Sequence, residues 1–489
     1  MSSNQEGHEG QLHRGLKSRH MNMIAIGGAI GTGLFVALGG SLSAAGPGGA
    51  LLAYGVIGIM VYFLMTSLGE MSTYMPVSGA FETYATKFVD PALGFALGWN
   101  YWYNWAITVA AELAAGAIVI QFWLPDSNPV LWSALFLALL FALNAFSAKM
   151  YGESEFWFAG IKVVTIVVFL VIGVLMILGI MGGKAPGFQN WVLEDAPFAG
   201  GLMAVINIFM IAGFSFQGTE LVGVAAGEAE DPEKNVPKAI RTVFWRILLF
   251  YIGAIIVVGF ILPYNDPNLL QGGVENVAVS PFTLIFERAG ILAAATIMNA
   301  VILTSVLSCG NSGLYAATRM LYAMAVEGKA PKMFTKVNKR GVPMAALIAT
   351  SVIGMAAFLS SLAGSGTVYL WLVNASGLAG FIAWLGIAIS HYKFRKAFLA
   401  QGHSLDELKF KAKWYPFGPI FAMILCLIVI IGQGTFAFSG GSIDWLGIVV
   451  AYIGIPLFLA LYVGYKVAKK TKAVNPEEAD LTKGFAKQI

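Results

Sequence analysis

The chain has 489 residues, of which 58% are hydrophobic and only 11% are charged. Soluble globular proteins carry about 45–50% apolar and about 25% charged residues. So little charge cannot cover a water-facing surface, and the composition therefore excludes a soluble protein. The net charge of +4 comes from few groups, which also argues against a nucleic-acid-binding protein.

Twelve apolar runs are long enough to cross a bilayer, a distance that takes about 20 mostly apolar residues. They cover residues 21–44, 48–74, 93–124, 130–149, 156–181, 198–227, 242–263, 281–325, 344–363, 367–391, 415–437 and 443–466. We therefore expect an all-α membrane protein with 12 transmembrane helices. Its membrane domain would span residues 21–466, between an N-terminal tail, 1–20, and a C-terminal tail, 467–489.

The positive charges predict the orientation, because lysine and arginine accumulate in cytoplasmic loops. If the N-terminus is inside, all but three of the 30 lysines and arginines lie inside. Lys184 and Arg288 lie outside, and Lys162 lies within a span. Both tails are therefore expected in the cytoplasm, around a multi-pass domain embedded in lipid.

Two runs are interrupted near the middle of the membrane. The first contains GGAIGTG at residues 27–33, and the sixth contains GFSFQGTE at residues 213–220. Each glycine disfavours helix by about 1 kcal/mol relative to alanine, and unwound backbone is tolerated in a membrane only where it is buried in protein or lines a cavity. The breaks lie five spans apart, so spans 1 and 6 run in opposite directions. This pattern predicts a five-plus-five inverted repeat of spans 1–5 and 6–10, with spans 11 and 12 as additions, and a transporter site at the breaks.

An α-amino acid suits two such breaks. The N-terminus of a half-helix offers N–H groups and a positive dipole to a carboxylate, and a half-helix C-terminus offers carbonyls to an ammonium. Close helix packing is the alternative explanation for the glycines. The sequence lacks a G-x-x-x-x-G-K-[ST] phosphate loop, which argues against an ATP-driven pump.

The chain resembles the amino acid transporter branch of the amino acid–polyamine–organocation superfamily, which contains bacterial and fungal permeases. The likeness covers about residues 12–470. It rests on residues 26–35, 45–50, 69–71, 98–102, 214–221, 226–228, 231–232 and 235–237. Within the branch, VYLWLVNASG at 368–377 and ISHY at 389–392 are most similar to bacterial permeases specific for lysine. The fungal basic amino acid permeases are similar here too.

The resemblance implies where an amino acid binds. The carboxylate would meet the N–H groups of Gly31, Thr32 and Gly33. The α-ammonium would meet the carbonyls of Ala29, Phe214 and Gln217, with the Phe214 ring acting as a lid.

Three ionisable residues, Glu112, Lys162 and Glu220, lie well inside spans, where each costs a few kcal/mol. The resemblance implies that the Lys162 amine takes the place of a sodium ion bound by sodium-driven relatives. We expect all three to couple transport to protons. A permanently charged brace remains the alternative for Lys162, and a packing carboxylic acid or contact with the substrate side chain for the glutamates.

Four polar residues lie within apolar runs, and they are a weaker prediction for the pocket that holds the substrate side chain. They are Asn104, Ser305, Asn374 and Ser376. Asn374 and Ser376 belong to the stretch that resembles lysine permeases, so we expect them to influence selectivity. Hydrogen bonding between helices is the alternative for each residue.

The expected function is proton-coupled import of L-lysine across a bacterial inner membrane by alternating access. The alternatives are another substrate (arginine, ornithine, histidine or a neutral amino acid), exchange instead of import, or a lysine transporter that also informs a membrane-bound regulator. An enzyme is not expected, because no nucleophile–histidine pair or metal-ligand pattern appears. Neither a cofactor nor a metal is expected, and Cys309 and Cys426 are expected to be buried apolar residues.

Overall fold

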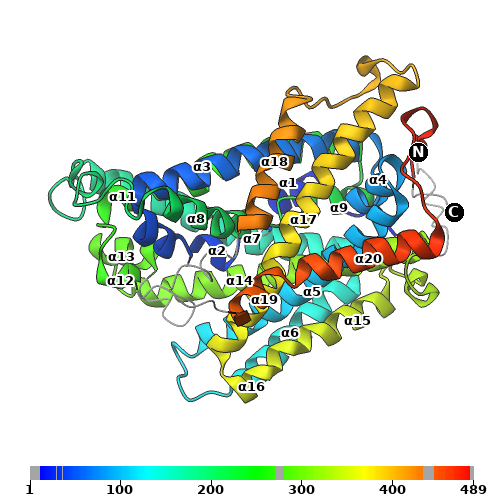
Figure 1. Ribbon diagram of the computed structural model, residues 1–489. Coiled ribbons are helices and arrows are strands. Elements are labelled where there is room, and N and C mark those ends of the chain that lie inside the picture. Colours follow the sequence, from blue (N-terminus) through cyan, green and yellow to red (C-terminus); the bar gives the residue numbers. More distant parts are fainter. Residues whose placement is uncertain (1–11, 29, 36, 271–279, 433–444, 485–489) are drawn as a thin grey trace, which may run out of the picture.

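The computed structural model describes residues 12–484 except Ala29, Val36, 271–279 and 433–444. Within these residues the chain forms helices and connecting loops (Figure 1), and the one strand-like pairing is an isolated bridge between Leu16 and Ala229. The predicted all-α class is confirmed.

The α-helices of the first half are α1 (Ser18–Gly27), α2 (Thr32–Phe35), α3 (Ala37–Tyr74), α4 (Ala80–Phe88), α5 (Pro91–Ile120), α6 (Pro129–Phe146), α7 (Ala148–Ile177), α8 (Gly201–Phe216) and α9 (Leu221–Ala225). Those of the second half are α10 (Pro232–Trp245), α11 (Ala254–Ile261), α12 (Pro267–Leu270), α13 (Pro281–Arg288), α14 (Ala294–Val326), α15 (Met344–Gly354), α16 (Ser360–Ala363), α17 (Ser365–Ala400), α18 (Phe417–Gly432), α19 (Trp445–Tyr452) and α20 (Gly454–Lys469). Shorter or differently wound turns are η1 (Gln189–Trp191), η2 (Ala226–Glu228), η3 (Arg246–Gly253), η5 (Lys332–Thr335), η6 (Met355–Leu359), η7 (Leu405–Glu407) and η9 (Pro476–Glu478).

Nine helical stretches of the described chain are long and apolar enough to cross a membrane. They are Ala37–Tyr74, Pro91–Ile120, Pro129–Phe146, Ala148–Ile177, Gly201–Glu228, Pro232–Ile261, Ala294–Val326, Met344–Ala363 and Ser365–Ala400. The protein is therefore a multi-pass membrane protein. The count of twelve spans stays a prediction, because the α1–α2 segment, α18 and α19–α20 are shorter or interrupted.

The first two predicted spans meet within α3. Gly46 has φ 71° and ψ 172° inside this helix, and Pro47 follows it. A side chain at residue 46 would be unfavourable for two reasons. The backbone lies in the left-handed region, and a Cβ would lie 2.7 Å from the carbonyl oxygen of Pro197. The bend falls in the gap between the predicted runs 21–44 and 48–74.

The predicted run 281–325 is not one helix. Helix α13 ends before Gly290, which has φ 81°, and α14 begins after Ala293, which has φ 60°. These left-handed residues end one helix and turn the chain into the next. The apolar run alone did not reveal them.

The two broken spans are confirmed, and they run in opposite directions. The first break separates α1 from α2, and the second separates α8 from α9, with Gly218 at φ 86°. Leu16, just before α1, exchanges backbone hydrogen bonds of 3.0 Å each with Glu228, the last residue of η2, and with Glu230. The start of one span therefore lies beside the end of the other.

Both described chain ends lie at one end of the helix bundle, opposite α12 and α13 (Figure 1). We call this end, which carries residues 12–17 and 470–484, the tail face. Helix α5 is the more deeply buried of the two long helices α5 and α7. In the most apolar part of α5, 83% of the residues are buried, against 28% in the most apolar part of α7. One face of α7 is therefore left for lipid, and its other face packs against α1 and α14.

Candidate functional site

A small cavity lies where the two broken spans meet. It is lined by six of the predicted residues, Gly31, Thr32, Gly33, Glu112, Phe214 and Gln217, and by Trp105, Thr108, Ser215 and Cys309. Its volume is about 20 Å³, roughly the space that a single water molecule needs. An amino acid can therefore enter only if the walls move apart.

Two glycines of the first break lie so close to neighbouring residues that a side chain at either position would force these neighbours to shift. A Cβ on Gly31 would lie 2.9 Å from Oε1 of Glu112, and a Cβ on Gly33 would lie 2.8 Å from Cα of Ser215. The glycines thus let the backbone of span 1 approach both α5 and the second break. This places backbone N–H groups, at the start of a helical segment, on the cavity wall.

Ser215 joins the two breaks. Its hydroxyl donates to the carbonyl of Gly33 at 2.9 Å and lies 3.2 Å from the hydroxyl of Tyr54. The hydroxyl of Tyr251 donates to the Ser215 carbonyl at 2.6 Å. The second break is therefore anchored to the first through side chains on spans 2 and 7, which sequence reasoning did not place at the site.

Helix α17 contacts both breaks through the stretch that resembles lysine permeases. The hydroxyl of Tyr369 donates to Thr32 Oγ1 at 3.0 Å, and Gln217 Nε2 donates to the carbonyl of Gly377 at 3.0 Å. Tyr369 was missed as a site residue, although it belongs to the stretch 368–377. A hydroxyl-bearing ring inside an apolar run was the available signal.

Lys162 is fully buried on α7. Its ammonium donates to the carbonyl of Gly27, the last residue of α1, at 2.8 Å. A cation is favourable at a helix C-terminus, where carbonyls lack intrahelical partners. Lys162 therefore holds one edge of the first break without lining the cavity.

Glu112 faces the same break from α5. It is buried, and its Oε2 has no hydrogen-bond partner among the described residues. Leaving such a group unsatisfied costs about 1–3 kcal/mol, and functional sites commonly bear this cost. Glu112 is thus available to a ligand or a proton.

Glu220 is held differently. Its carboxylate accepts from the Tyr101 hydroxyl at 3.2 Å, from Trp384 Nε1 at 3.1 Å and from the backbone N–H of Gly218 at 3.0 Å. These three donors tie the second break to α5 and α17. Glu220 is not among the cavity-lining residues, and its role in proton coupling stays a prediction.

Of the weaker pocket residues, Asn104, Ser305 and Ser376 are buried but are not among those that line the cavity. The Asn104 carbonyl accepts from the Thr108 hydroxyl at 2.8 Å, and Ser305 and Ser376 donate to carbonyls of their own helices at 2.9 and 3.1 Å. Ala29 and the side chain of Asn374 lie outside the described part of the chain. Their predicted roles stay predictions.

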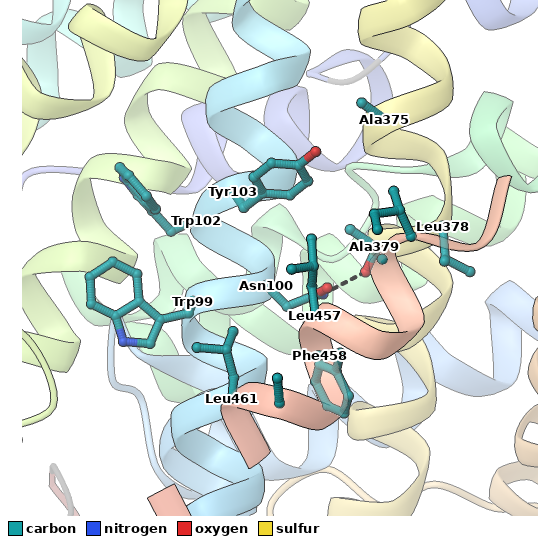
Figure 2. A pocket seen from close by; sticks show the side chains of 13 residues that line it. Trp99, Asn100, Trp102, Tyr103, Ala375, Leu378, Ala379, Leu457, Phe458 and Leu461 are labelled. Atoms are coloured by element: carbon teal, nitrogen blue, oxygen red, sulfur yellow. Dashed lines mark hydrogen bonds between the residues drawn. The ribbon is translucent and has the colours of Figure 1, made fainter. Parts of the chain in front are cut away.

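A larger cavity of about 430 Å³ lies elsewhere, between α5, α17 and α20 (Figure 2). Trp99, Trp102 and Phe458 give it an apolar wall. The amide of Asn100, on the same wall, already donates to the carbonyl of Ala379 at 2.8 Å. This cavity offers no charged group to a zwitterion, so size alone does not identify the transport site.

No group of three or more histidine, cysteine, aspartate or glutamate side chains in the described residues could hold a metal ion. Cys309 and Cys426 are both buried, as expected, although Cys309 also lines the small cavity.

The sequence matches the family described as amino acid permease over residues 20–475. A lysine-specific permease, LysP, from Escherichia coli is 58% identical over 468 residues, which cover 96% of each chain. LysP from Lactococcus lactis is 52% identical over 481 residues, or 97% of this chain and 94% of the relative. A histidine permease, HisP, from the same organism is 48% identical over 477 residues, or 97% and 99%.

Proposed function

The chain belongs to the amino acid permease family, and from this premise we propose that it imports L-lysine together with protons across a bacterial inner membrane. The observation that carries the proposal is the cavity between the broken spans, where backbone of the first break faces Phe214 and Gln217 of the second. Such a site offers a carboxylate and an ammonium their separate partners.

Lysine is favoured over other amino acids by the relatives and by the position of the stretch that resembles lysine permeases. The relatives named as lysine-specific are 52–58% identical to this chain over nearly its whole length. The stretch 368–377 also contacts both breaks, through Tyr369 and Gly377. Histidine is the second candidate, because the histidine permease is 48% identical.

Transport requires the cavity to open to each side in turn. Between the cavity and the tail face, Arg319 pairs with Glu228 at 3.0 Å, and Tyr315 donates to Glu228 at 3.1 Å. We place the tail face, with the tails 1–20 and 467–489, in the cytoplasm. The Glu228–Arg319 pair then closes the inner side, and lysine enters from the opposite face.

Lys162 would link protons to this movement. As an ammonium it holds the end of α1 through the Gly27 carbonyl. As a neutral amine it loses the charge that favours this contact, and the first break is freed to move. One elementary charge crossing 100 mV is worth about 2.3 kcal/mol, so co-import of a lysine cation and a proton is driven strongly by an inside-negative potential.

Uptake of radiolabelled lysine by the purified protein in liposomes tests the proposal. An inside-alkaline gradient and an inside-negative potential would be imposed separately, with unlabelled arginine, ornithine, histidine and phenylalanine as competitors. We expect both gradients to raise uptake and lysine to compete best. Uptake that ignores protons and requires internal amino acid would show an exchanger, and stronger competition by histidine would change the substrate.

The variant Lys162→Ala tests the coupling residue. We expect it to bind lysine detectably in a calorimetric titration, because the side chain does not line the cavity, and to lose accumulation driven by an inside-alkaline gradient. Gradient-driven accumulation equal to that of the wild type would contradict the assignment of Lys162.

A further inference from the structure

A second buried carboxyl group lies near Lys162, outside the cavity. Glu155 of α7 is fully buried. Its Oε1 accepts a hydrogen bond from the Ser308 hydroxyl at 2.5 Å, whereas its Oε2 has no partner among the described residues. An unpaired buried carboxylate oxygen is costly unless it is protonated or serves a function.

Glu155, Ala159 and Lys162 share the buried face of α7. The Lys162 ammonium binds the carbonyl of Gly27, and a Cβ on Gly27 would lie only 2.5 Å from the Cβ of Ala159. The ammonium therefore lies near the level of Ala159, because helical side chains lean toward the N-terminus. Ala159 is about one helical turn from Glu155, a rise of about 6 Å at 1.5 Å per residue.

The buried arginines of this region, Arg319 and Arg246, are hydrogen-bonded to groups other than Glu155. Arg319 of α14 is bound to Glu228, and Arg246 of η3 donates to the Ala25 carbonyl and the Tyr251 hydroxyl.

His20 Nε2 of α1 lies 3.2 Å from Oε1 of the partly exposed Glu153, and Glu112 of α5 lines the small cavity. Among the described residues, Lys162 is therefore the cation that shares the buried face of α7 with Glu155, and its ammonium is bound to a carbonyl oxygen.

Polar side chains continue from Glu155 toward the tail face. Tyr151 lies one turn before Glu155 on α7, and Ser312 lies one turn after Ser308 on α14, with 3.2 Å between the two hydroxyl oxygens. The Tyr151 ring stacks on Tyr315 with centroids 4.0 Å apart, and Tyr315 donates to Glu228. A row of polar side chains therefore leads from Glu155 to the Glu228–Arg319 ion pair.

We propose that Glu155 accepts the coupling proton from Lys162 and passes it toward the tail face. Because Lys162 and Glu155 share no hydrogen bond, a water molecule between them takes one proton from the ammonium and gives another to Glu155. One N–H bond of the ammonium breaks and one O–H bond forms on Glu155, which leaves a neutral amine, a neutral carboxylic acid and the water unchanged. No charge is then left unpaired in the protein interior. The inference rests on proton-coupled transport as proposed above, and it adds the residue that receives the proton.

The variant Glu155→Gln tests the relay in liposomes, because an amide still accepts from Ser308 but cannot take up the proton. We expect accumulation driven by an inside-alkaline gradient to fall to the level without a gradient. Exchange of external radiolabelled lysine against internal lysine should persist with an unchanged half-saturation concentration. The matched control is Glu153→Gln on the same helix, whose side chain is partly exposed and bound to Arg19; it should accumulate lysine as the wild type does.

The outcomes separate the two proposals. If the wild type itself ignores the proton gradient, the proposed function is wrong. If the wild type is coupled and Glu155→Gln is equally coupled, the relay is wrong. If Glu155→Gln loses exchange as well, Glu155→Asp decides: recovery of gradient-driven accumulation supports a proton-carrying role, whereas no recovery shows that Glu155 only supports the fold.

Discussion

At the scale of single residues, the site depends on the absence of side chains as much as on their presence. Gly31 and Gly33 allow span 1 to approach Glu112 and Ser215 within distances that a Cβ would violate. The backbone of the break is thereby exposed to the cavity, where N–H groups can bind a carboxylate.

Gly33→Ala should abolish lysine binding. Its Cβ would lie 2.8 Å from the backbone Cα of Ser215, which cannot move aside as a flexible side chain could. Isothermal titration of the detergent-solubilised variant measures the loss. Gly40→Ala is the matched control, because a Cβ there meets no atom within 4 Å. Wild-type affinity in Gly33→Ala would place the site elsewhere.

Tyr369→Phe should weaken lysine binding about fivefold, since a buried hydrogen bond contributes about 1 kcal/mol. The variant leaves Thr32 without the donor that orients its hydroxyl. Tyr103→Phe, at the wall of the separate apolar cavity, should leave the affinity unchanged. Equal affinities for both variants and the wild type would exclude a role of Tyr369 in the site.

At the scale of elements, the loop helix α4 is joined to the end of α14 by a buried charge cluster. Lys329 Nζ lies 2.5 Å from Glu82 Oε1 and 2.6 Å from Glu327 Oε2. Burial, together with the charge of Glu327, raises the pKa of Glu82 to about 8 despite the opposing charge of Lys329. Glu82 therefore retains a proton in the folded protein at pH values where the unfolded chain releases it.

Stability should consequently fall as pH rises from about 4.5 to about 8, because the folded state binds the additional proton in that window. The melting temperature of the solubilised protein should decline across this range. Glu82→Gln carries no ionisable group and should flatten the decline. Glu478→Gln, an exposed change in the C-terminal tail, should keep the wild-type slope; an unchanged slope in Glu82→Gln would contradict the assignment.

At the scale of the whole molecule, the described conformation is closed toward the tail face. Glu228 ends span 6, and Arg319 belongs to α14; both are buried, and the Arg319 guanidinium lies 4.3 Å from the ring centroid of Tyr315. Opening the cavity toward the tail face must separate this pair. Removing one partner of a buried ion pair typically costs about 3–5 kcal/mol, which here would disfavour the closed state.

Glu228→Gln should therefore increase access to the cavity from the tail face. Cys309 lines the cavity and serves as a reporter once Cys426 is replaced by serine. A membrane-impermeant thiol reagent applied to inside-out vesicles should label Cys309 faster in Glu228→Gln than in the parent. Glu230→Gln, an exposed neighbour, should label at the parental rate. Equal rates for Glu228→Gln and the parent would show that the pair does not close this side.

The amino-acid sequence was sufficient for the membrane class, for both broken spans and for most of the cavity wall. Hydropathy and glycine clusters are local properties, and local backbone preferences decide where a helix breaks. The motif at 27–33 and the motif at 213–220 therefore predicted residues that meet in space. The stretch 368–377, which the likeness singled out for selectivity, lies on a helix that contacts both breaks.

The remaining features depend on neighbours that are distant in the chain. The donation from Tyr369 to Thr32 joins residues 337 positions apart, and the bond from Ser308 to Glu155 joins residues 153 positions apart. Whether a buried carboxyl group lines the cavity, as Glu112 does, or is satisfied by three donors, as Glu220 is, follows from helix packing. Hydropathy treats these glutamates alike, because it records the cost of burying a charge and not the partners that offset this cost.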